Sequence, residues 1–370
     1  MQTDMADRPK GELSPAKRVL FWGILSMVPV LFVLVAVAGY YLYGYVTLTA
    51  EYCEPFASLD DEIGWTLTPG ADSCVNGRES AFGPLAFASR VALNRDGARV
   101  AATGDETQTG GLLVIGDSWS FGYGIEWHDT FAAQLADDFP VALFASPAYS
   151  GAQALLLGRR VAPTVAPRFI VYLELGFWER AVCTGEVRPA AILKPCYWAD
   201  PATGEAELVS PPPGYVTRAA AWGLRPGGMV GAGEKTLGYF LIARPWSKLH
   251  SLLVRAGLAS GFADDFAARA PVPELDAVRR AHYRGLRALA AETGATLVLI
   301  DPGAVYADAR ASAGSDPAVV YVDRAKWDAM VEMPMAQLPL SEARVPVDGH
   351  YGPGTHRLIA DLVRRAIAQR

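Results

Sequence analysis

The chain lacks the features of several common classes of protein. Its formal net charge is −6, so it has no basic excess that would attract nucleic acid. It has four cysteines and five histidines, but no CxxC spacing and no cluster of His with Cys. Neither a zinc site nor a dithiol redox motif is indicated. We therefore expect no nucleic-acid partner, no metal and no organic cofactor.

Charge is also absent from one long stretch. Between Val19 and Val46 there is no Lys, Arg, Asp or Glu. At about 1.5 Å per residue, a helix of this length crosses a hydrocarbon core of about 30 Å. We predict a transmembrane helix over 19–46. A cleaved signal peptide is the alternative, because Ala36-Val37-Ala38 has the small-residue pattern of a cleavage site.

The charges on either side of this stretch predict its orientation. Lys10, Lys17 and Arg18 precede it, and acidic residues follow it between positions 51 and 62. An excess of basic residues marks the cytoplasmic side, so we expect residues 1–18 to form a cytoplasmic tail. The rest of a chain anchored in the inner membrane then lies in the periplasm or outside the cell.

All four cysteines lie beyond the apolar stretch, in what this topology makes an oxidising compartment where disulfides persist. Four cysteines allow three connectivities, and the pairs nearest in sequence are the simplest solution. These pairs are Cys53 with Cys74, and Cys183 with Cys196. We expect the cysteines to have a structural role.

An extended segment rich in glycine and polar residues covers 47–110, and after it apolar runs typical of strands alternate with helical patterns. The expected strands are 112–115, 141–145, 169–175, 296–300 and 318–322, and the expected helices are 130–138, 153–161, 274–293 and 355–368. This alternation predicts an α/β domain over 111–370, with a parallel sheet covered on both faces. We expect the segment at about 201–273 to form an insertion: a lid over the site, a surface resting on the membrane, or helices packed on the core.

Two short motifs lie at opposite ends of this domain. Gly116-Asp117-Ser118 follows the first predicted strand, and Asp348-Gly349-His350 precedes the last predicted helix. A serine hydroxyl needs a base to take its proton, and a histidine backed by a carboxylate is the usual one. Because both motifs fall at ends of elements where α/β sheets place their sites, we expect Ser118, His350 and Asp348 to meet.

These residues resemble the SGNH/GDSL hydrolases in their membrane-anchored bacterial form. The block from Gly116 to Gly124 is similar to the family's first block, and Asp129-Thr130-Phe131 follows it as in anchored relatives. Upstream, Asp61-Glu62-Ile63-Gly64-Trp65 contains a "GW" phrase and Leu93-Asn94-Arg95-Asp96-Gly97 an "N-x-x-G" phrase. The resemblance implies a flavodoxin-like three-layer α/β/α fold.

The resemblance also implies an oxyanion hole made by the backbone N–H groups of Ser118 and Gly151 together with an asparagine after the third strand. The chain departs from this pattern: it reads Gly176-Phe177-Trp178-Glu179-Arg180 there, and its only asparagines are Asn76 and Asn94. Either two backbone donors suffice, or the Trp178 indole or the Arg180 guanidinium replaces the asparagine, or catalysis has been lost. The spacing of Asp348 and His350 resembles that of the alginate-acetylating branch of the superfamily.

The function that this resemblance implies is a serine esterase that removes small acyl groups, such as acetyl, from a cell-envelope carbohydrate. With the same triad, an O-acetyltransferase that receives its acyl group from a membrane partner and acts on an exported polysaccharide is the second hypothesis. A non-catalytic carbohydrate-binding or assembly protein is the third.

The remaining histidines are assigned structural roles. We expect His356 to lie on the surface or to cap the last helix, and His128 to face solvent or the pocket rim. His250 and His282 fall in helical patterns and are expected to be partly buried or at the surface. Asp117 is expected to accept backbone N–H groups in the turn that presents Ser118.

Overall fold

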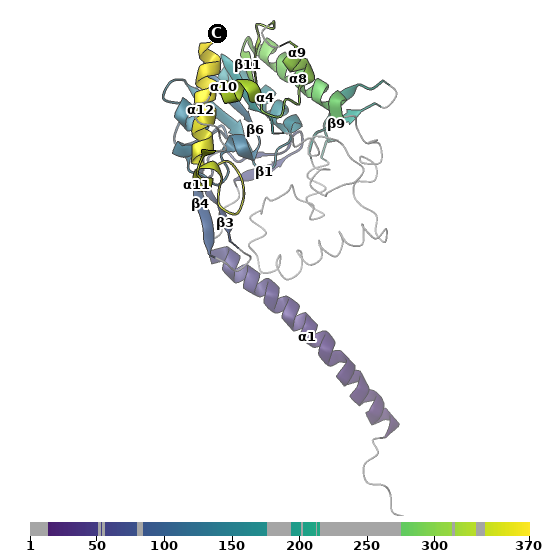
Figure 1. Cartoon of the computed structure of the whole chain (residues 1–370). Coiled ribbons are helices and arrows are strands. Elements are labelled where there is room, and N and C mark those ends of the chain that lie inside the picture. The colour runs from purple at the N-terminus through teal and green to yellow at the C-terminus, as the bar shows by residue number, and fades with distance from the viewer. Residues whose placement is uncertain are drawn as a thin grey trace, which may run out of the picture. The chain divides into compact units, whose positions relative to one another are not determined.

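The computed structural model describes residues 14–50, 53, 56–79, 84–175, 194–200, 203–211, 213–214, 275–312, 315–330 and 337–370. Helix α1 (Pro15–Ala50) belongs to one compact unit, and the described residues from Cys53 onward belong to another. Figure 1 identifies the elements by label.

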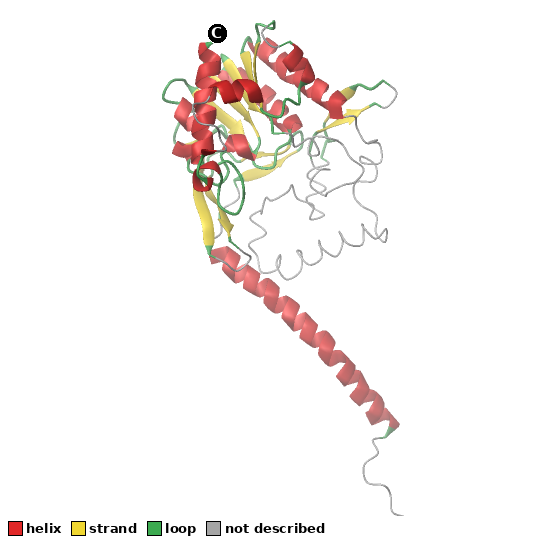
Figure 2. Ribbon diagram, in the orientation of Figure 1, coloured by secondary structure: helices red, strands yellow, loops and turns green. Residues whose placement is uncertain are grey.

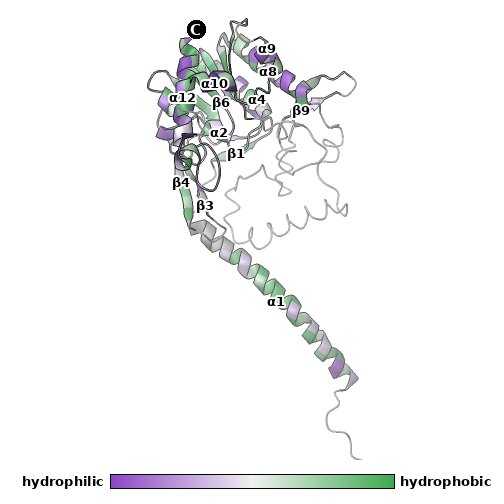
Figure 3. Ribbon diagram, viewed as in Figure 1, coloured by the Kyte–Doolittle hydropathy of each residue, from purple (hydrophilic) through white to green (hydrophobic). Residues whose placement is uncertain are grey.

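Helix α1 is apolar enough to span a membrane. Within its span Pro15–Tyr40, a window of 18 residues has a mean hydropathy of 2.6, and none of that window is buried inside the protein. Figure 3 shows the apolar residues along this helix in green. The helix begins at a proline, a residue favoured in the first turn, and its internal Pro29 is of a kind that membrane helices tolerate. It extends beyond the predicted limits 19–46 at both ends.

The second unit is built on an eight-stranded sheet with the order β12-β11-β8-β6-β7-β5-β4-β3. Five of its strands are parallel to one another: β6 (Leu112–Gly116), β7 (Val141–Ala145), β8 (Phe169–Leu173), β11 (Thr296–Asp301) and β12 (Val319–Asp323). Taken in chain order, these five lie in the order 2-1-3-4-5, which is the flavodoxin-like order. The predicted α/β class with a mostly parallel sheet is confirmed.

Three further strands extend this sheet in the antiparallel sense. They are β3 (Asp72–Arg78), β4 (Leu85–Leu93) and β5 (Arg99–Val100). Arg99 pairs with Leu143, so this extension is hydrogen-bonded to β7. Part of the segment predicted only as extended therefore belongs to the main sheet. Two further strands, β1 (Ala57–Asp60) and β2 (Gly64–Leu67), form a separate antiparallel pair.

The disulfides agree in part with the predicted pairing. Cys53 is bonded to Cys74, which fastens residue 53 to strand β3. Cys196 is also disulfide-bonded, and Cys183, the remaining cysteine, lies outside the described residues. A disulfide in the unit that follows α1 indicates an oxidising compartment.

Helices cover both faces of the sheet (Figure 2). On one face, α4 (Gly151–Val165) and α8 (Leu275–Thr293) pack against Leu113 and Ile115 of β6, while on the other α3 (Phe131–Leu135) and α12 (Pro353–Ala368) pack against Leu112 and Val114. Because both faces of β6 are covered, the whole strand is apolar and buried. The remaining elements are η1 (Trp127–Asp129), α2 (Ser118–Phe121), β9 (Cys196–Ala199), β10 (Ala206–Val209), α9 (Ala307–Ala311), α10 (Arg324–Met330) and α11 (Leu340–Ala343).

Candidate active site

Ser118 lies directly beyond the carboxyl end of β6, as the first residue of α2. The side chain of Asp117 caps this helix, because its Oδ1 accepts the Trp119 backbone N–H at 3.0 Å. This is the role predicted for Asp117. Ser118 is 4% exposed. The strand order reverses between β6 and β8, so the serine lies where doubly wound sheets place their ligands.

His350 lies in the loop between α11 and α12, 232 residues from the serine. Its Nε2 is 2.7 Å from the Ser118 Oγ. Its Nδ1 is hydrogen-bonded to Oδ1 of Asp348. The structure thus brings the three predicted residues together, with the imidazole between the hydroxyl and the carboxylate. Such a chain of groups can take a proton from the serine and stabilise the resulting imidazolium.

Two aromatic rings next to the serine contact the imidazole, and the sequence analysis did not single them out. The centroid of His350 is 4.8 Å from that of Trp119 and 5.0 Å from that of Tyr123. Burial raises the pKa of Tyr123, and the Asp348 charge raises it further, so the phenol stays protonated. The only sequence signal for these contacts is that both residues follow Ser118 closely.

The rings continue into a small cluster on the His350 loop. The Trp119 centroid is 4.3 Å from that of Tyr351, and the Arg344 guanidinium carbon lies 5.2 Å and 4.9 Å from the Trp119 and Tyr351 centroids. The Arg344 guanidinium also donates to the Gly349 carbonyl at 2.9 Å. Arg344 therefore connects the ring cluster to the loop that carries the imidazole.

Gly151, the predicted oxyanion-hole residue, begins α4. The first N–H groups of a helix have no acceptor within it, and the helix dipole favours negative charge there. Ser150 and Gln153 form a capping box that fixes this end. A Cβ at position 151 would lie 2.9 Å from ring atoms of His282 and 3.0 Å from the Tyr172 hydroxyl, so the position requires glycine.

The loop before Gly151 is tied to the nucleophile turn and to the upstream "GW" phrase. The Ser146 N–H donates to the Gly116 carbonyl at 3.3 Å. The Tyr149 hydroxyl donates to the Trp65 carbonyl at 2.7 Å, and the Gln153 amide donates to the Ile63 carbonyl at 2.8 Å. The upstream phrase therefore supports the loop that ends at Gly151.

The "N-x-x-G" phrase forms a turn. Oδ1 of Asn94 accepts the N–H groups of Asp96 and Ala98, each at 3.0 Å. Gly97 has a φ of 83°, a left-handed conformation that glycine adopts easily. The turn leads directly into β5 and has a structural role.

A buried polar network lies behind Gly151, on the side of β8. The Tyr306 hydroxyl donates to Oε2 of Glu174 at 2.7 Å, and the Tyr172 hydroxyl does so at 3.4 Å. The Tyr197 hydroxyl is 2.9 Å from Nδ1 of His282. Burial raises the pKa of Tyr172 and of Tyr306, so both phenols remain donors.

The predicted placement of two histidines is wrong. His282, a residue of α8, is fully buried against the rings of Tyr172 and Tyr197, and burial lowers its pKa to about 3. His356 is also fully buried, because its face of α12 packs on α3; its Nδ1 accepts the Phe131 N–H at 3.1 Å. Burial lowers the pKa of His356 to about 3 as well.

The other predicted residues have mixed outcomes. The side chain of His128 is 78% exposed, as expected. His250, Trp178 and Arg180 lie outside the described residues, as does most of the predicted insertion. The structure therefore bears on two of the three expected oxyanion donors, Ser118 and Gly151. Within the described part of the chain, no group of three acidic, His or Cys residues could hold a metal ion.

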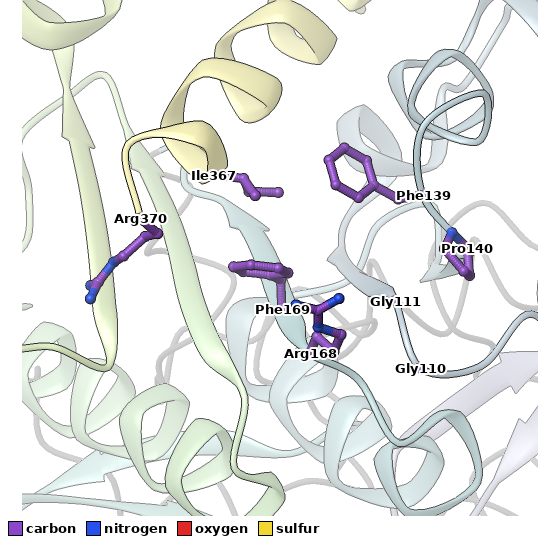
Figure 4. Close-up of a pocket in the computed structure, with 8 residues that line it drawn as sticks. All are labelled: Gly110, Gly111, Phe139, Pro140, Arg168, Phe169, Ile367 and Arg370. Atoms are coloured by element: carbon purple, nitrogen blue, oxygen red, sulfur yellow. The ribbon is translucent and has the colours of Figure 1, made fainter.

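A pocket of about 360 Å³ lies at the amino ends of the parallel strands, opposite to the ends that carry Ser118 (Figure 4). Its lining is mostly apolar with two arginines: Gly110, Gly111, Phe139, Pro140, Arg168, Phe169, Ile367 and Arg370. A five-residue strand is about 16 Å long, so the pocket is separate from Ser118. Comparisons of the sequence with models of protein families and with curated proteins find no match.

Proposed function

We propose that the protein is a serine esterase of the SGNH type that removes small ester-linked acyl groups, acetyl above all, from a carbohydrate of the cell envelope. The observation that carries the proposal is the 2.7 Å approach of His350 Nε2 to Ser118 Oγ, with Asp348 on the other ring nitrogen. This arrangement suits nucleophilic acyl transfer.

In the proposed reaction, the Ser118 hydroxyl attacks the ester carbonyl as His350 accepts its proton at Nε2. The imidazolium then protonates the departing sugar oxygen, which leaves an acyl-serine. Water, deprotonated by His350, attacks this ester and releases the free acid, while the proton returns to Ser118. Asp348 accepts the Nδ1 hydrogen bond and keeps Nε2 free to act as the base.

The negative charge on the carbonyl oxygen would be stabilised by backbone donors. Ser118 and Gly151 each occupy the first position of a helix, where N–H groups lack intrahelical acceptors. The N-terminus of α4, a helix of 15 residues, also contributes its dipole. Loss of one such donor typically costs about 100- to 1,000-fold in turnover.

Two features support a carbohydrate of the cell envelope as the substrate. The helix α1 can anchor the chain in a membrane, and the disulfide between Cys53 and Cys74 suits a compartment outside the cytoplasm. The partly exposed rings of Trp119 and Tyr123 flank the imidazole, and flat apolar ring faces of this kind can support a sugar ring.

The full chain in detergent should release acid from short-chain aryl esters and from acetylated glycans. We expect Ser118→Ala and His350→Ala to lower turnover at least about 1,000-fold, and a fluorophosphonate probe to label the wild type but not Ser118→Ala. His128→Ala, which changes an exposed histidine, is the matched control and should keep full activity. Equally slow release by the wild type and both variants would contradict the proposal.

The same measurement distinguishes hydrolysis from transfer. A hydrolase releases free acid in the absence of any acceptor. If the acyl group is instead recovered on an added oligosaccharide, and free acid is a minor product, the sugar hydroxyl replaces water in the second step. The triad then serves an O-acyltransferase whose donor is supplied by a membrane partner.

A further inference from the structure

Arg99 is the least expected buried residue near the site. It belongs to β5, in the antiparallel extension of the sheet, and it is 1% exposed. Within the described residues, no carboxylate lies within ion-pair distance of its guanidinium. Burial lowers its pKa to about 9, so at pH 7 it remains a cation. The Glu126 charge favours this cation but makes no ion pair with it, so the buried guanidinium needs other hydrogen-bond partners.

Three of those partners are backbone carbonyls that follow the nucleophile, and the fourth is the Arg90 carbonyl on β4, which accepts from Nη2 at 3.4 Å. Nη1 of Arg99 donates to the carbonyls of Phe121 and Gly122, the latter at 2.8 Å, and Nη2 donates to the Ile125 carbonyl at 2.7 Å. The guanidinium carbon also lies 4.5 Å from the Phe121 ring centroid. Helix α2 has one turn only, so the helix does not continue to supply N–H partners for these carbonyls. The Gly122 carbonyl also accepts the Ile125 N–H at 3.3 Å.

The same turn holds the nucleophile from its other side. The N–H groups of Gly122 and Tyr123 donate to the Ser118 carbonyl at 3.1 Å and 2.9 Å. The N–H groups of the turn therefore bind Ser118, while its carbonyls bind Arg99. A displacement of the turn moves the backbone of the serine.

The turn also touches the loop of the base. The Tyr123 ring lies against the His350 ring, and a Cβ at Gly124 would be 2.8 Å from a methyl group of Val345. The Val345 N–H in turn donates to the His350 carbonyl at 2.8 Å. The turn from Gly122 to Ile125 thus contacts both residues of the Ser118–His350 pair.

We propose that Arg99 is a positioning residue of the active site, whose guanidinium fixes the turn from Gly122 to Ile125 and so sets the approach of His350 to Ser118. The inference rests on the proposed esterase function, in which that approach is catalytic. It makes the antiparallel extension part of the catalytic apparatus. Reactions that depend on placement lose about 100-fold when a group shifts by about 1 Å.

The test is Arg99→Lys in the full chain, with Arg95→Lys as the matched control, because Arg95 lies in the same segment with a side chain that is 77% exposed. A lysine ammonium is a point donor, so it does not reproduce the hydrogen bonds that the planar guanidinium makes to several carbonyls at once. We expect kcat on an aryl acetate to fall 10- to 100-fold in Arg99→Lys, with KM changed less than threefold. The control should match the wild type.

A second readout is independent of turnover. In protein labelled with ¹³C-histidine, the His350 Cε1 signal, assigned with His350→Gln, should shift in Ser118→Ala and in Arg99→Lys, and stay in place in Arg95→Lys. A wild type without esterase activity would reject the proposed function, and the signal would still decide whether Arg99 positions the pair. An unchanged signal in Arg99→Lys, or a kcat equal to that of the control, would overturn the inference.

If Arg99→Lys loses its cooperative unfolding transition, Gly124→Ala provides the test. It keeps the guanidinium and displaces the same turn, because the added methyl group meets Val345 and the backbone has a φ of 84°. We expect the same shift of the His350 signal and a similar loss of kcat. A wild-type signal and kcat in a folded Gly124→Ala variant would overturn the proposal.

Discussion

The serine and the histidine of the site are held in different ways. Ser118 is 4% exposed and follows β6, in which all five residues are buried. His350 lies in a loop whose residues 346–349 are exposed, and 20% of its side chain is accessible. The serine is thus fixed by the core of the domain. The histidine depends on a carboxylate and two rings for its orientation.

The difference shows which residues must orient the imidazole. The position of a nucleophile that follows a buried strand is fixed by the sheet, where packing is dense and backbone groups are paired. A base on an exposed loop has less of this support, so each contact of its side chain matters. Besides Ser118, the imidazole contacts Asp348, Trp119 and Tyr123.

Asp348→Asn tests the exposed loop that carries His350, and it should have the largest effect among changes to the groups that support the pair. The amide no longer stabilises the imidazolium, so we expect turnover to fall about 100-fold with little change in KM. In a buried triad the same change costs about 10⁴-fold. The Asp348 side chain is 29% exposed, so water replaces part of the lost interaction. Steady-state kinetics on an aryl acetate measure the loss.

The same substitution next to the buried serine, Asp117→Asn, is the control. In Asp117→Asn, an amide oxygen can still accept the Trp119 N–H, which caps the helix as before. We expect turnover to fall less than tenfold. Equal losses of turnover in Asp348→Asn and Asp117→Asn would mean that the serine and the histidine depend equally on their neighbouring carboxylates, contrary to the structure.

The fold could be predicted where burial leaves a mark on the sequence. The strands β6, β7 and β11 are buried on both faces, so each contains a continuous apolar run that can be recognised directly. Strand β3 contains polar residues at most positions, and β5 has two residues. Neither has a pattern that distinguishes it from a loop, which is why the antiparallel extension was not predicted.

The site shows the same limit. Ser118 and His350 belong to motifs, so their meeting could be predicted from the ends of two elements. Arg99 belongs to no motif, and an arginine in a polar segment is usually exposed, so its burial depends on tertiary contacts alone. His282 and His356 were misplaced because a helical pattern does not by itself reveal which face is buried.

The two histidines buried in the core of the domain make the folded state less stable at low pH. His282 and His356 are neutral in the folded state because burial lowers the pKa of each to about 3, from 6.5. The unfolded chain takes up these protons below about pH 6.5, so stability falls as the pH is lowered from 6.5 towards 3. Each histidine costs about 1.4 kcal/mol per pH unit in that window.

We expect the free energy of unfolding to fall by about 4 kcal/mol between pH 7 and pH 5 from these two histidines together. Urea titrations of the full chain, followed by tryptophan fluorescence, measure it. His356→Asn keeps an acceptor for the Phe131 N–H and should halve the pH slope. His128→Asn, at an exposed position, should leave the slope as in the wild type. An unchanged slope in His356→Asn would mean that His356 is not the source of the pH dependence.

The smallest effects are expected from two strained residues. One lies in the loop before Gly151 and the other on the exposed loop of His350. Ala148, in the loop before Gly151, has a φ of 62°, and Val347, beside Asp348, has a φ of 56°. A residue with a Cβ pays about 1–2 kcal/mol in this conformation, and glycine recovers part of it. We expect Ala148→Gly and Val347→Gly each to raise the free energy of unfolding by about 1 kcal/mol in urea titrations.

Turnover should separate the two variants. The loop of Ala148 is held by the Tyr149 hydroxyl on the Trp65 carbonyl and by the capping box of α4, so Ala148→Gly should keep wild-type turnover. Val347 lies on the exposed loop, where glycine admits conformations that carry Asp348 away from His350. We expect turnover to fall several-fold in Val347→Gly despite the higher stability. If it keeps full turnover, the rings and the carboxylate alone orient the imidazole, and the strained backbone contributes nothing to the site.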